Sequence, residues 1–427
     1  MALLRTLTVL EHELIPVRDR APALGSNLSA GLEQACLSSE EADELLRINE
    51  RRKGFCSRVP AGIKLAHYCG IVRLRDCIVE VLPKIRLHER RAPEELHRSR
   101  GTLLRMLHVA DLRALTTLDA APQSTVKSPL LDVFIEAFLN CALDQARRGL
   151  LFRYEAASDG VRTLRGRFNS HRHARHNLAK PHLLHCDFDE FSPDNPFNQA
   201  VTATLQACRS WIIQPRTQRL WFEAQACFAG VSVRRMTHRE VAQLARDRTN
   251  RHYDPLLRWC EWLLSISSPS MAAGLHDAPG LLFDMNQLFE NFVGAQEAEN
   301  AGHEFIVQRQ QPARYLASTA PHEQTNAFLI APDITIAKRS TSGPEQRIVR
   351  IVDAKWKRLN PASTSWGVEV ADVYQMLAYA TRYQCRRVEL VYPMSAQQAE
   401  QPGQPPVFHI DVAGTEGIEV AVRQLAC

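Results

Sequence analysis

Two apolar runs separated by a turn-forming segment most constrain how this chain can fold. The first run, residues 328–337, reads FLIAPDITIA, and the second, residues 348–356, reads IVRIVDAKW. Between them lies RSTSGPEQ, whose Ser, Gly and Pro residues favour a turn. Runs of this length that are rich in Ile and Val predict β-strands, and the short connection predicts that the two strands pair as a hairpin.

Such a hairpin would bring two aspartates together. A turn centred on Gly343 places Asp333, ten residues before it, opposite Asp353, ten residues after it. Residues directly opposite each other on paired strands have Cβ atoms about 5 Å apart. Because side chains alternate along a strand, Lys355 is expected on the same face as Asp353.

This arrangement predicts a metal site. Two carboxylates so close repel each other unless a cation lies between them. Mg²⁺ is the expected cation because it prefers oxygen ligands and keeps several waters, and Mn²⁺ is an alternative. Such a metal acidifies a bound water and neutralises charge on a phosphate, so Asp333, Asp353 and Lys355 form a candidate centre for phosphodiester hydrolysis. The competing interpretation is two surface aspartates on a hairpin.

Helices are expected on both sides of this hairpin. Residues 283–299 form a predicted helix that carries Glu290. Residues 368–383 form another, in which Gln375 and Tyr379 are four residues apart and therefore share one face. The order of elements predicts an α/β (α+β) fold with a mixed sheet flanked by helices.

The rest of the chain divides into two further regions. Residues 1–125 contain short predicted strands, notably 70–74 and 77–83, and residues 126–270 are mainly helical. A Ser/Pro/Gly-rich segment at residues 266–280 is the best linker candidate, and residues 271–427 form the last predicted domain. No GxxxxGK[ST] motif is present, so the chain has no phosphate-binding loop of its own.

A basic stretch in the middle region is a second candidate site. Residues 161–186 contain no Asp or Glu. The candidate nucleic-acid contacts within it are Arg162, Arg165, Arg167, Arg172 and Arg175. Clustered arginines can face a phosphate backbone, although a solvated protein surface explains them equally well.

Composition excludes several other classes. The chain is 45% hydrophobic and 23% charged, which is ordinary for a folded globular protein. No run approaches the roughly 18 uncharged residues of a membrane span, and the N-terminus lacks the order of a signal peptide. Eleven scattered cysteines without a CxxC pair fit reduced thiols better than disulfides. We therefore expect a cytoplasmic protein without membrane association.

Four motifs resemble those of McrC, the nuclease subunit of the McrBC 5-methylcytosine-dependent restriction systems. They are LFDMNQLFENFV at 282–293, APDITI at 331–336, IVDAKWK at 351–357 and DVYQMLAYA at 372–380. Weaker similarities upstream extend the resemblance over most of the chain. The resemblance implies a PD-(D/E)xK nuclease domain with Asp333 and Asp353 as metal ligands and Lys355 as the catalytic lysine. The implied supporting residues are Glu290, Gln375 and Tyr379.

The resemblance also implies a partner and a substrate. A McrC-like chain docks through its N-terminal region on a hexameric AAA+ GTPase of the McrB type and stimulates GTP hydrolysis. The partner recognises modified cytosine in double-stranded DNA, and the McrC-like nuclease cuts the DNA, a function in antiviral defence. This chain departs from the family around residues 87–100 and 216–260, where it looks longer. The resemblance therefore does not define which residues form its docking surface.

Two other functions compete with a DNA endonuclease subunit. One is an activator of an NTPase whose own cleavage is secondary or lost, and intact Asp333, Asp353 and Lys355 argue against it. The other is a free-standing nuclease acting on RNA or single strands. The size of the region before Gly280 argues against this second alternative.

Overall fold

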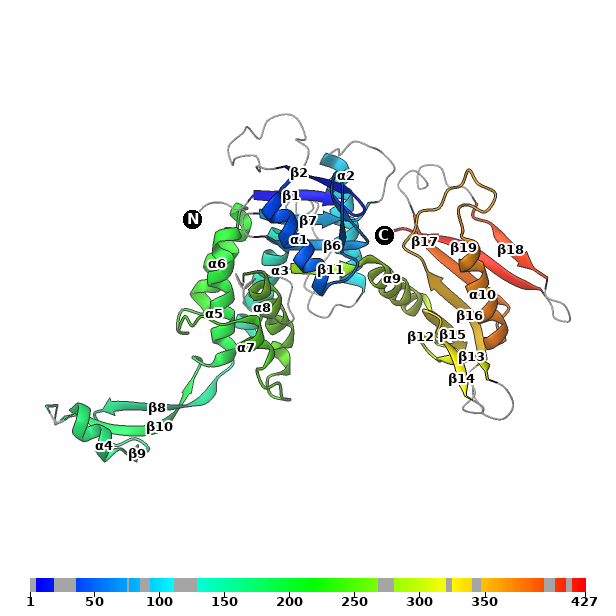
Figure 1. Cartoon of the computed structure of the whole chain (residues 1–427). Coiled ribbons are helices and arrows are strands. Elements are labelled where there is room, and N and C mark those ends of the chain that lie inside the picture. The colour runs from blue at the N-terminus through cyan, green and yellow to red at the C-terminus, as the bar shows by residue number, and fades with distance from the viewer. Residues whose placement is uncertain are drawn as a thin grey trace. The chain divides into compact units, whose positions relative to one another are not determined.

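The structure of this chain is a computed structural model. It describes residues 5–18, 36–74, 77–84, 93–110, 129–177, 179–180, 182–267, 280–319, 325–339, 347–394, 404–411 and 417–427. The chain forms two compact units, one drawn mainly from residues 128–280 and the other combining residues 5–127 with 281–427 (Figure 1). Helices and mixed sheets occur together, which confirms the predicted α/β class.

The middle unit is built on helices whose apolar faces form one core. Its α-helices are α3 (Leu130–Arg148), α5 (Pro196–Cys208), α6 (Pro215–Cys227), α7 (His238–Ala242) and α8 (Asp254–Ser267), with the short 3-10 helices η3 (Arg209–Trp211) and η4 (Arg251–Tyr253). Phe134 of α3 packs on Trp259 of α8 with ring centroids 6.0 Å apart. Asn195 caps α5 by accepting hydrogen bonds from the backbone N–H groups of Phe197 and Asn198.

The basic stretch lies on a hairpin in this middle unit. The hairpin forms a three-stranded sheet with short helices, comprising β8 (Arg153–Val161), β9 (Arg167–Phe168), α4 (Ser170–Arg172), the π-helix η2 (His173–Asn177) and β10 (Leu184–Ser192). Strands β8 and β10 pair antiparallel over nine residues. The stretch therefore connects two long strands.

The N-terminal part of the other unit contains a four-stranded sheet ordered β1-β7-β6-β11. Its strands are β1 (Arg5–Leu10), β6 (Tyr68–Arg73), β7 (Cys77–Leu82) and β11 (Gly280–Asp284). Strands β6 and β7 pair antiparallel, as predicted, whereas β1 and β7 are parallel. Gly70 has φ +134°, and a Cβ there would come within 1.9 Å of the Leu281 carbonyl oxygen, so only glycine allows β11 to pack beside β6.

Strand β11 explains why the first and third predicted domains share one compact unit. The strand follows the predicted linker, most of which lies outside the described residues, and it joins the N-terminal sheet before the helix α9 (Met285–Asn300) begins. The backbone N–H of Met285 donates to the carbonyl of His67, and the Arg52 side chain donates to the carbonyl of Leu282. The segments before residue 128 and after residue 280 therefore belong to one compact unit, and the middle region forms the other.

A second small sheet, ordered β3-β2-β5-β4, accompanies the first. Its strands are β2 (Leu14–Arg18), β3 (Leu37–Ser38), β4 (Cys56–Val59) and β5 (Gly62–Leu65), and the helices of this region are α1 (Ser39–Arg51) and α2 (Pro93–Val109). Helix α1 begins with a capping box in which Ser38 and Glu41 satisfy each other's backbone N–H groups.

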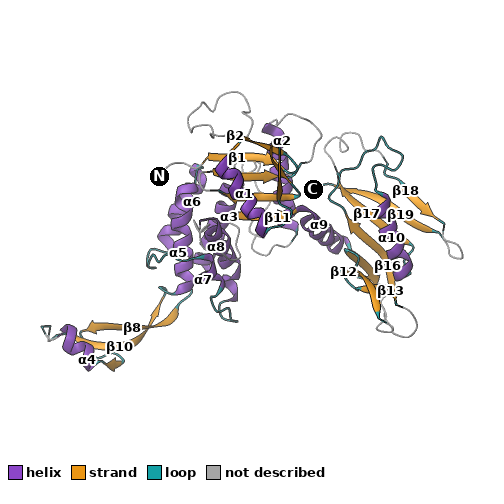
Figure 2. Ribbon diagram, viewed as in Figure 1, coloured by secondary structure: helices purple, strands orange, loops and turns teal. Residues whose placement is uncertain are grey.

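The C-terminal part is a six-stranded mixed sheet, ordered β12-β15-β16-β17-β19-β18 (Figure 2). Its elements are α9 (Met285–Asn300), β12 (Phe305–Arg309), β15 (Ile334–Lys338), β16 (Arg347–Ala354), α10 (Val370–Tyr383), β17 (Arg387–Pro393), β18 (Val407–Ile410) and β19 (Ile418–Leu425). Strands β16 and β17 are parallel, and the crossover between them contains α10. A separate two-stranded ribbon consists of β13 (Arg314–Ser318) and β14 (Asn326–Ile330).

The first predicted strand of the hairpin is in fact two strands. Residues 328–337 are divided between β14, which pairs with β13, and β15, which pairs with β12 and β16. Pro332 lies at the break, where its missing N–H is not needed for a ladder. The predicted turn around Gly343 lies outside the described residues.

Candidate functional site

The site begins with the pairing of β15 and β16. Ile334 pairs with Val352, Thr335 with Ile351, and Ile336 with Arg350, which is the predicted register. A bulge after Ile336 shifts the register by one residue toward the turn. The predicted register is therefore correct at the end of the strands next to Asp333 and Asp353 and wrong at the end next to the turn. Asp333 immediately precedes β15, and Asp353 is the next residue of β16 after Val352.

Asp353 is fully buried, with a relative exposure of 0%. Its Oδ2 atom lies 2.6 Å from Nζ of Lys355, which is on the same face two residues later. No N–H or O–H group of the described residues donates a hydrogen bond to its Oδ1 atom. A buried carboxylate oxygen without a donor is costly unless another cation meets it.

Asp333 approaches the same point from the neighbouring strand. Its Oδ2 atom accepts a hydrogen bond of 2.9 Å from the backbone N–H of Ala354, the residue directly after Asp353. The two carboxyl groups are close enough that the charge of Asp333 raises the pKa of Asp353. The predicted convergence of Asp333, Asp353 and Lys355 on one face is therefore present.

Burial makes both aspartates hard to ionise. Burial first, and the charge of the Asp333 carboxylate second, raise the pKa of Asp353 to about 7. Burial, with the charge of Glu290 as the next cause, likewise raises the pKa of Asp333 to about 6. A divalent cation would relieve both effects because it stabilises the charged forms.

Glu290 lies on α9 and completes the acidic cluster. Burial raises its pKa, and so does the charge of Asp353. It hydrogen-bonds Gln310, whose backbone N–H donates to the carbonyl of Asp333 over 2.9 Å. Gln310 follows β12 with φ +48° and has no sequence signal of its own, so motif spacing could not reveal it.

The carboxylate oxygens of Asp333 and Asp353 fit Mg²⁺ better than a metal whose ligands all come from protein side chains. Among the residues that the structure describes, no three His, Cys, Asp or Glu side chains form a ready-made metal cluster. Mg²⁺ is commonly bound through one or two carboxylates and completes its shell with water and substrate phosphates. Asp333 and Asp353 are thus the residues that could hold it.

Helix α10 fixes the lysine through a chain of hydrogen bonds. Nζ of Lys355 donates to Oε1 of Gln375 over 2.9 Å, and Nε2 of Gln375 donates to the Tyr379 hydroxyl over 2.9 Å. The Tyr379 hydroxyl donates to the carbonyl of Ala331 over 3.1 Å. The chain returns to the segment that carries Asp333, so both sides of the site are braced by one helix face.

Replacing Tyr379 with Phe tests this brace. The substitution removes the hydroxyl that joins Gln375 to Ala331 and leaves the buried ring in place. Both hydrogen bonds of the hydroxyl are lost, and a loss of about 1 kcal/mol in the positioning of Lys355 predicts a fivefold to tenfold slower phosphodiester hydrolysis, the reaction expected of this centre, with an unchanged Michaelis constant. Tyr374→Phe on the exposed face of the same helix, where Tyr374 is 68% exposed, is the matched control. Equal rates for Tyr379→Phe and wild type would contradict the brace.

The raised pKa values predict a pH dependence of the metal-free protein. Carboxyl groups with folded-state pKa values near 6 and 7 bind more protons than in the unfolded chain, where the pKa is about 4. Stability should therefore fall as pH rises from about 4 to 7. In EDTA, the melting temperature of Asp353→Asn should exceed that of wild type by a margin that grows from pH 5 to pH 8. A difference in melting temperature that does not change with pH would show that ionisation of the aspartates is not coupled to folding.

The basic stretch belongs to the other compact unit. Its five arginines all lie on the hairpin of the middle unit and are exposed. They are Arg162, Arg165, Arg167, Arg172 and Arg175. Arg165 lies 4.2 Å from the Phe188 ring centroid and 3.5 Å from Glu190, so part of its charge is used within the hairpin. A nucleic-acid role for this group stays a prediction.

An α/β protein with a buried acidic site on a mixed sheet is thus the class that the geometry defines. Residues 63–393 match a family model described as McrBC 5-methylcytosine restriction system component. The match covers more than half of the chain and includes every residue of the cluster around Asp353. The chain therefore belongs to this family, and the predicted family resemblance is confirmed.

Solved structures support the fold. One chain of a structure described as "Refined half-complex from tetradecameric assembly of Thermococcus gammatolerans McrB AAA+ hexamers with bound McrC" has a TM-score of 0.64 and 17% identity, with 99% of this chain and 95% of that chain covered. The cryo-EM structure of the Thermococcus gammatolerans McrBC complex has a TM-score of 0.47 and 19% identity, with 69% of this chain and 88% of that chain covered. No curated protein matches the chain significantly.

The structure also bears on membrane association. Within the described ranges, no helix has the length and apolar character needed to cross a membrane.

Proposed function

We propose that this chain is the Mg²⁺-dependent DNA endonuclease subunit of a McrBC-like restriction system. The observation that carries the proposal is the pair of buried carboxyl groups, Asp333 and Asp353, beside Lys355. In an ion pair with a purely structural role, both carboxylate oxygens accept hydrogen bonds. Oδ1 of Asp353, in contrast, has no donor among the described residues. A group in this state at the end of two paired strands is suited to binding a cation and a phosphate.

The residues of the site have separate chemical tasks. Asp333 and Asp353 would hold the cation, which when bound acidifies water and neutralises charge on the phosphate. Burial opposes the charge on Lys355, but the neighbouring carboxylates raise its pKa above the ordinary value, so the ammonium keeps its proton. Lys355 therefore serves as a fixed donor and positive charge toward a phosphate oxygen, and Gln375 holds its direction.

The partner follows from the family. The similar structure from Thermococcus gammatolerans is described as McrB AAA+ hexamers with bound McrC, and the present chain aligns over nearly its whole length with a chain of that assembly. The chain itself has no phosphate-binding loop. We infer that it binds a AAA+ GTPase of the McrB type, stimulates GTP hydrolysis by that partner, and cuts double-stranded DNA carrying modified cytosine.

The test combines two measurements on the full chain and its AAA+ partner. GTP turnover should be absent for the chain alone and should rise when the chain is added to the partner. A plasmid carrying 5-methylcytosine should be cut in Mg²⁺ with GTP and should stay intact in EDTA. GTPase stimulation without any cutting would identify a non-cleaving activator, and cutting of RNA or single strands without the partner would identify a free-standing nuclease.

A further inference from the structure

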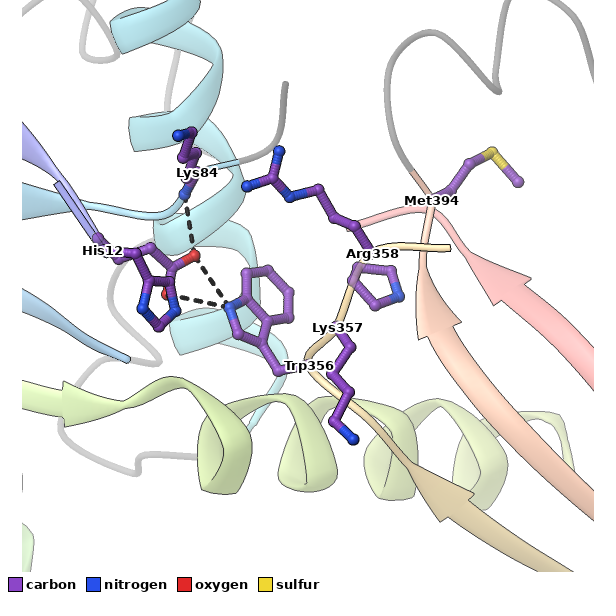
Figure 3. A pocket seen from close by; sticks show the side chains of 8 residues that line it. His12, Lys84, Trp356, Lys357, Arg358 and Met394 are labelled. Carbon is purple, nitrogen blue, oxygen red and sulfur yellow. Dashed lines mark hydrogen bonds and ion pairs between the residues drawn. The ribbon is translucent and has the colours of Figure 1, made fainter. Parts of the chain in front are cut away.

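A second polar feature lies next to the acidic site, within the same compact unit. It is a pocket of about 210 Å³ beyond the carboxyl ends of four strands (Figure 3). Glu11 and His12 follow β1, Lys84 follows β7, residues 356–358 follow β16, and Met394 follows β17. Ligands of open α/β sheets bind beyond the carboxyl ends of strands, so the position is suited to a ligand.

The pocket is positively charged. Lys84, Lys357 and Arg358 line it, and in Figure 3 the Arg358 side chain extends toward Lys84. Lys357 also forms an ion pair of 2.9 Å with Glu369, so its charge is partly compensated. Burial lowers the pKa of His12, and the positive charges of its neighbours lower it further, which leaves His12 neutral near pH 7. Lys84 and Arg358 bring two further positive charges to the lining, and both lower the pKa of the neighbouring Glu11 carboxyl group.

Glu11 is the one carboxyl group among the residues that line the pocket. Its side chain is almost fully buried. Its Oε1 atom accepts hydrogen bonds from the backbone N–H of Lys84 over 2.9 Å and from Nε1 of Trp356 over 3.0 Å. Burial also raises its pKa to about 7, which weakens its repulsion of an anion. Glu11 thus holds Lys84 and Trp356 in place at the base of the pocket.

Size and location narrow the ligand. The volume is below the roughly 300–1,000 Å³ of pockets that enclose a drug-sized molecule, so it suits a phosphate group rather than a whole nucleotide. Trp356 directly follows Lys355, and three residues of chain from Lys355 to Arg358 span at most about 11 Å. One DNA strand advances about 3.4 Å along the helix axis per phosphate, so this distance corresponds to about three nucleotides.

We propose that this pocket binds a backbone phosphate of the DNA, one to about three nucleotides away from the phosphate that is cut. The inference rests on the proposed function, and it identifies Lys84 and Arg358 as contacts that position the strand. The Trp356 indole, held by Glu11 and packed 5.3 Å from the Phe289 ring, forms the base of the subsite. A phosphate held here would fix the register of the strand over Asp333 and Asp353.

The test is the salt dependence of DNA binding by the full chain. Binding of a fluorescent duplex is measured by anisotropy in EDTA over a series of salt concentrations, so that no cleavage occurs. Loss of one phosphate contact should reduce the slope of log K against log salt by about 0.9 and weaken binding about fivefold to tenfold at low salt. Lys84→Gln should show both effects for any duplex sequence, because its backbone N–H to Glu11 is retained.

Three variants complete the comparison. Arg358→Gln should behave as Lys84→Gln does, and Lys84→Arg should restore the wild-type slope because it keeps the charge. Lys338→Gln is the matched control, since Lys338 is an exposed lysine at the other end of β15 from Asp333. Wild-type slopes in both Lys84→Gln and Arg358→Gln, or no duplex binding by wild type, would overturn the subsite.

Two further outcomes separate this proposal from others. A changed slope in Lys84→Gln together with no cutting by wild type in Mg²⁺ and GTP would retain the subsite and reject the nuclease. Normal cutting by wild type together with a wild-type slope in Lys84→Gln would retain the nuclease and reject the subsite. Inorganic phosphate, titrated at constant ionic strength, should displace the duplex from wild type more readily than from Lys84→Gln, because phosphate and the DNA backbone compete for the same pocket. Equal displacement from both proteins would place the competition elsewhere and overturn the subsite.

Discussion

Asp353→Asn should lower DNA cleavage at least about a thousandfold, equivalent to roughly 4 kcal/mol of transition-state stabilisation. The substitution removes the charge of the buried carboxylate and leaves Asp333 with water as the other ligand of the cation. Shape and volume are nearly unchanged, so the loss should come from chemistry rather than from packing. Cleavage of a methylated plasmid in Mg²⁺ and GTP, in the presence of the AAA+ partner, measures the effect.

Two measurements distinguish loss of metal from loss of fold. Mg²⁺ at about one hundred times its dissociation constant should stabilise wild type by about 2.7 kcal/mol and should not stabilise Asp353→Asn. The variant should still stimulate GTP hydrolysis by the partner. Asp411→Asn, at an exposed position after β18, is the control and should cut DNA normally. Full cutting by Asp353→Asn would refute the site, and joint loss of cutting and GTPase stimulation would indicate a failure of folding or assembly.

Lys355→Ala should reduce cleavage by nearly as much, about two to three decades, while the chain still binds the metal. Lysine is not a metal ligand, so the stabilisation by Mg²⁺ should persist. Loss of its ammonium group removes the charge that lies 2.6 Å from Oδ2 of Asp353 and the donor to Gln375. The pKa of Asp353 should rise further as a result, because the lysine is the cation that lowers it.

The contrast between the two variants is the decisive result. Asp353→Asn should lose cutting and Mg²⁺-dependent stabilisation together, whereas Lys355→Ala should lose cutting alone. Lys338→Ala controls for removal of a lysine from the same sheet. If Lys355→Ala also abolished the effect of Mg²⁺ on the melting temperature, the lysine would be needed for metal binding and its assigned task would be wrong.

The sequence by itself determined the local part of the site. Alternation along a strand put Asp353 and Lys355 on one face, and helical spacing put Gln375 and Tyr379 on another. Symmetry about Gly343 put Asp333 opposite Asp353, and the observed pairs of Ile334 with Val352 and Thr335 with Ile351 agree with it. These relations depend on residues close along the chain or joined by one short turn, for which side-chain period and turn geometry are sufficient information.

Other features of the same site have no local signal. The break of residues 328–337 into β14 and β15 depends on two different partner strands, β13 and β16. The link from Glu290 to Asp333 passes through Gln310, which follows a strand with no motif. Residue types and spacing cannot show such contacts, because they depend on which distant elements pack together.

Only the tertiary structure decided how the two ends of the chain combine. Strand β11 joins the N-terminal sheet beside Gly70, and Glu11 accepts a hydrogen bond from Trp356, 345 residues later in the chain. The periodicity of a single sequence predicts that a helix or strand has an apolar face, but it does not predict which other helix or sheet packs against that face. The aspartates and the lysine could therefore be found from the sequence, whereas the charged pocket beside them required the fold.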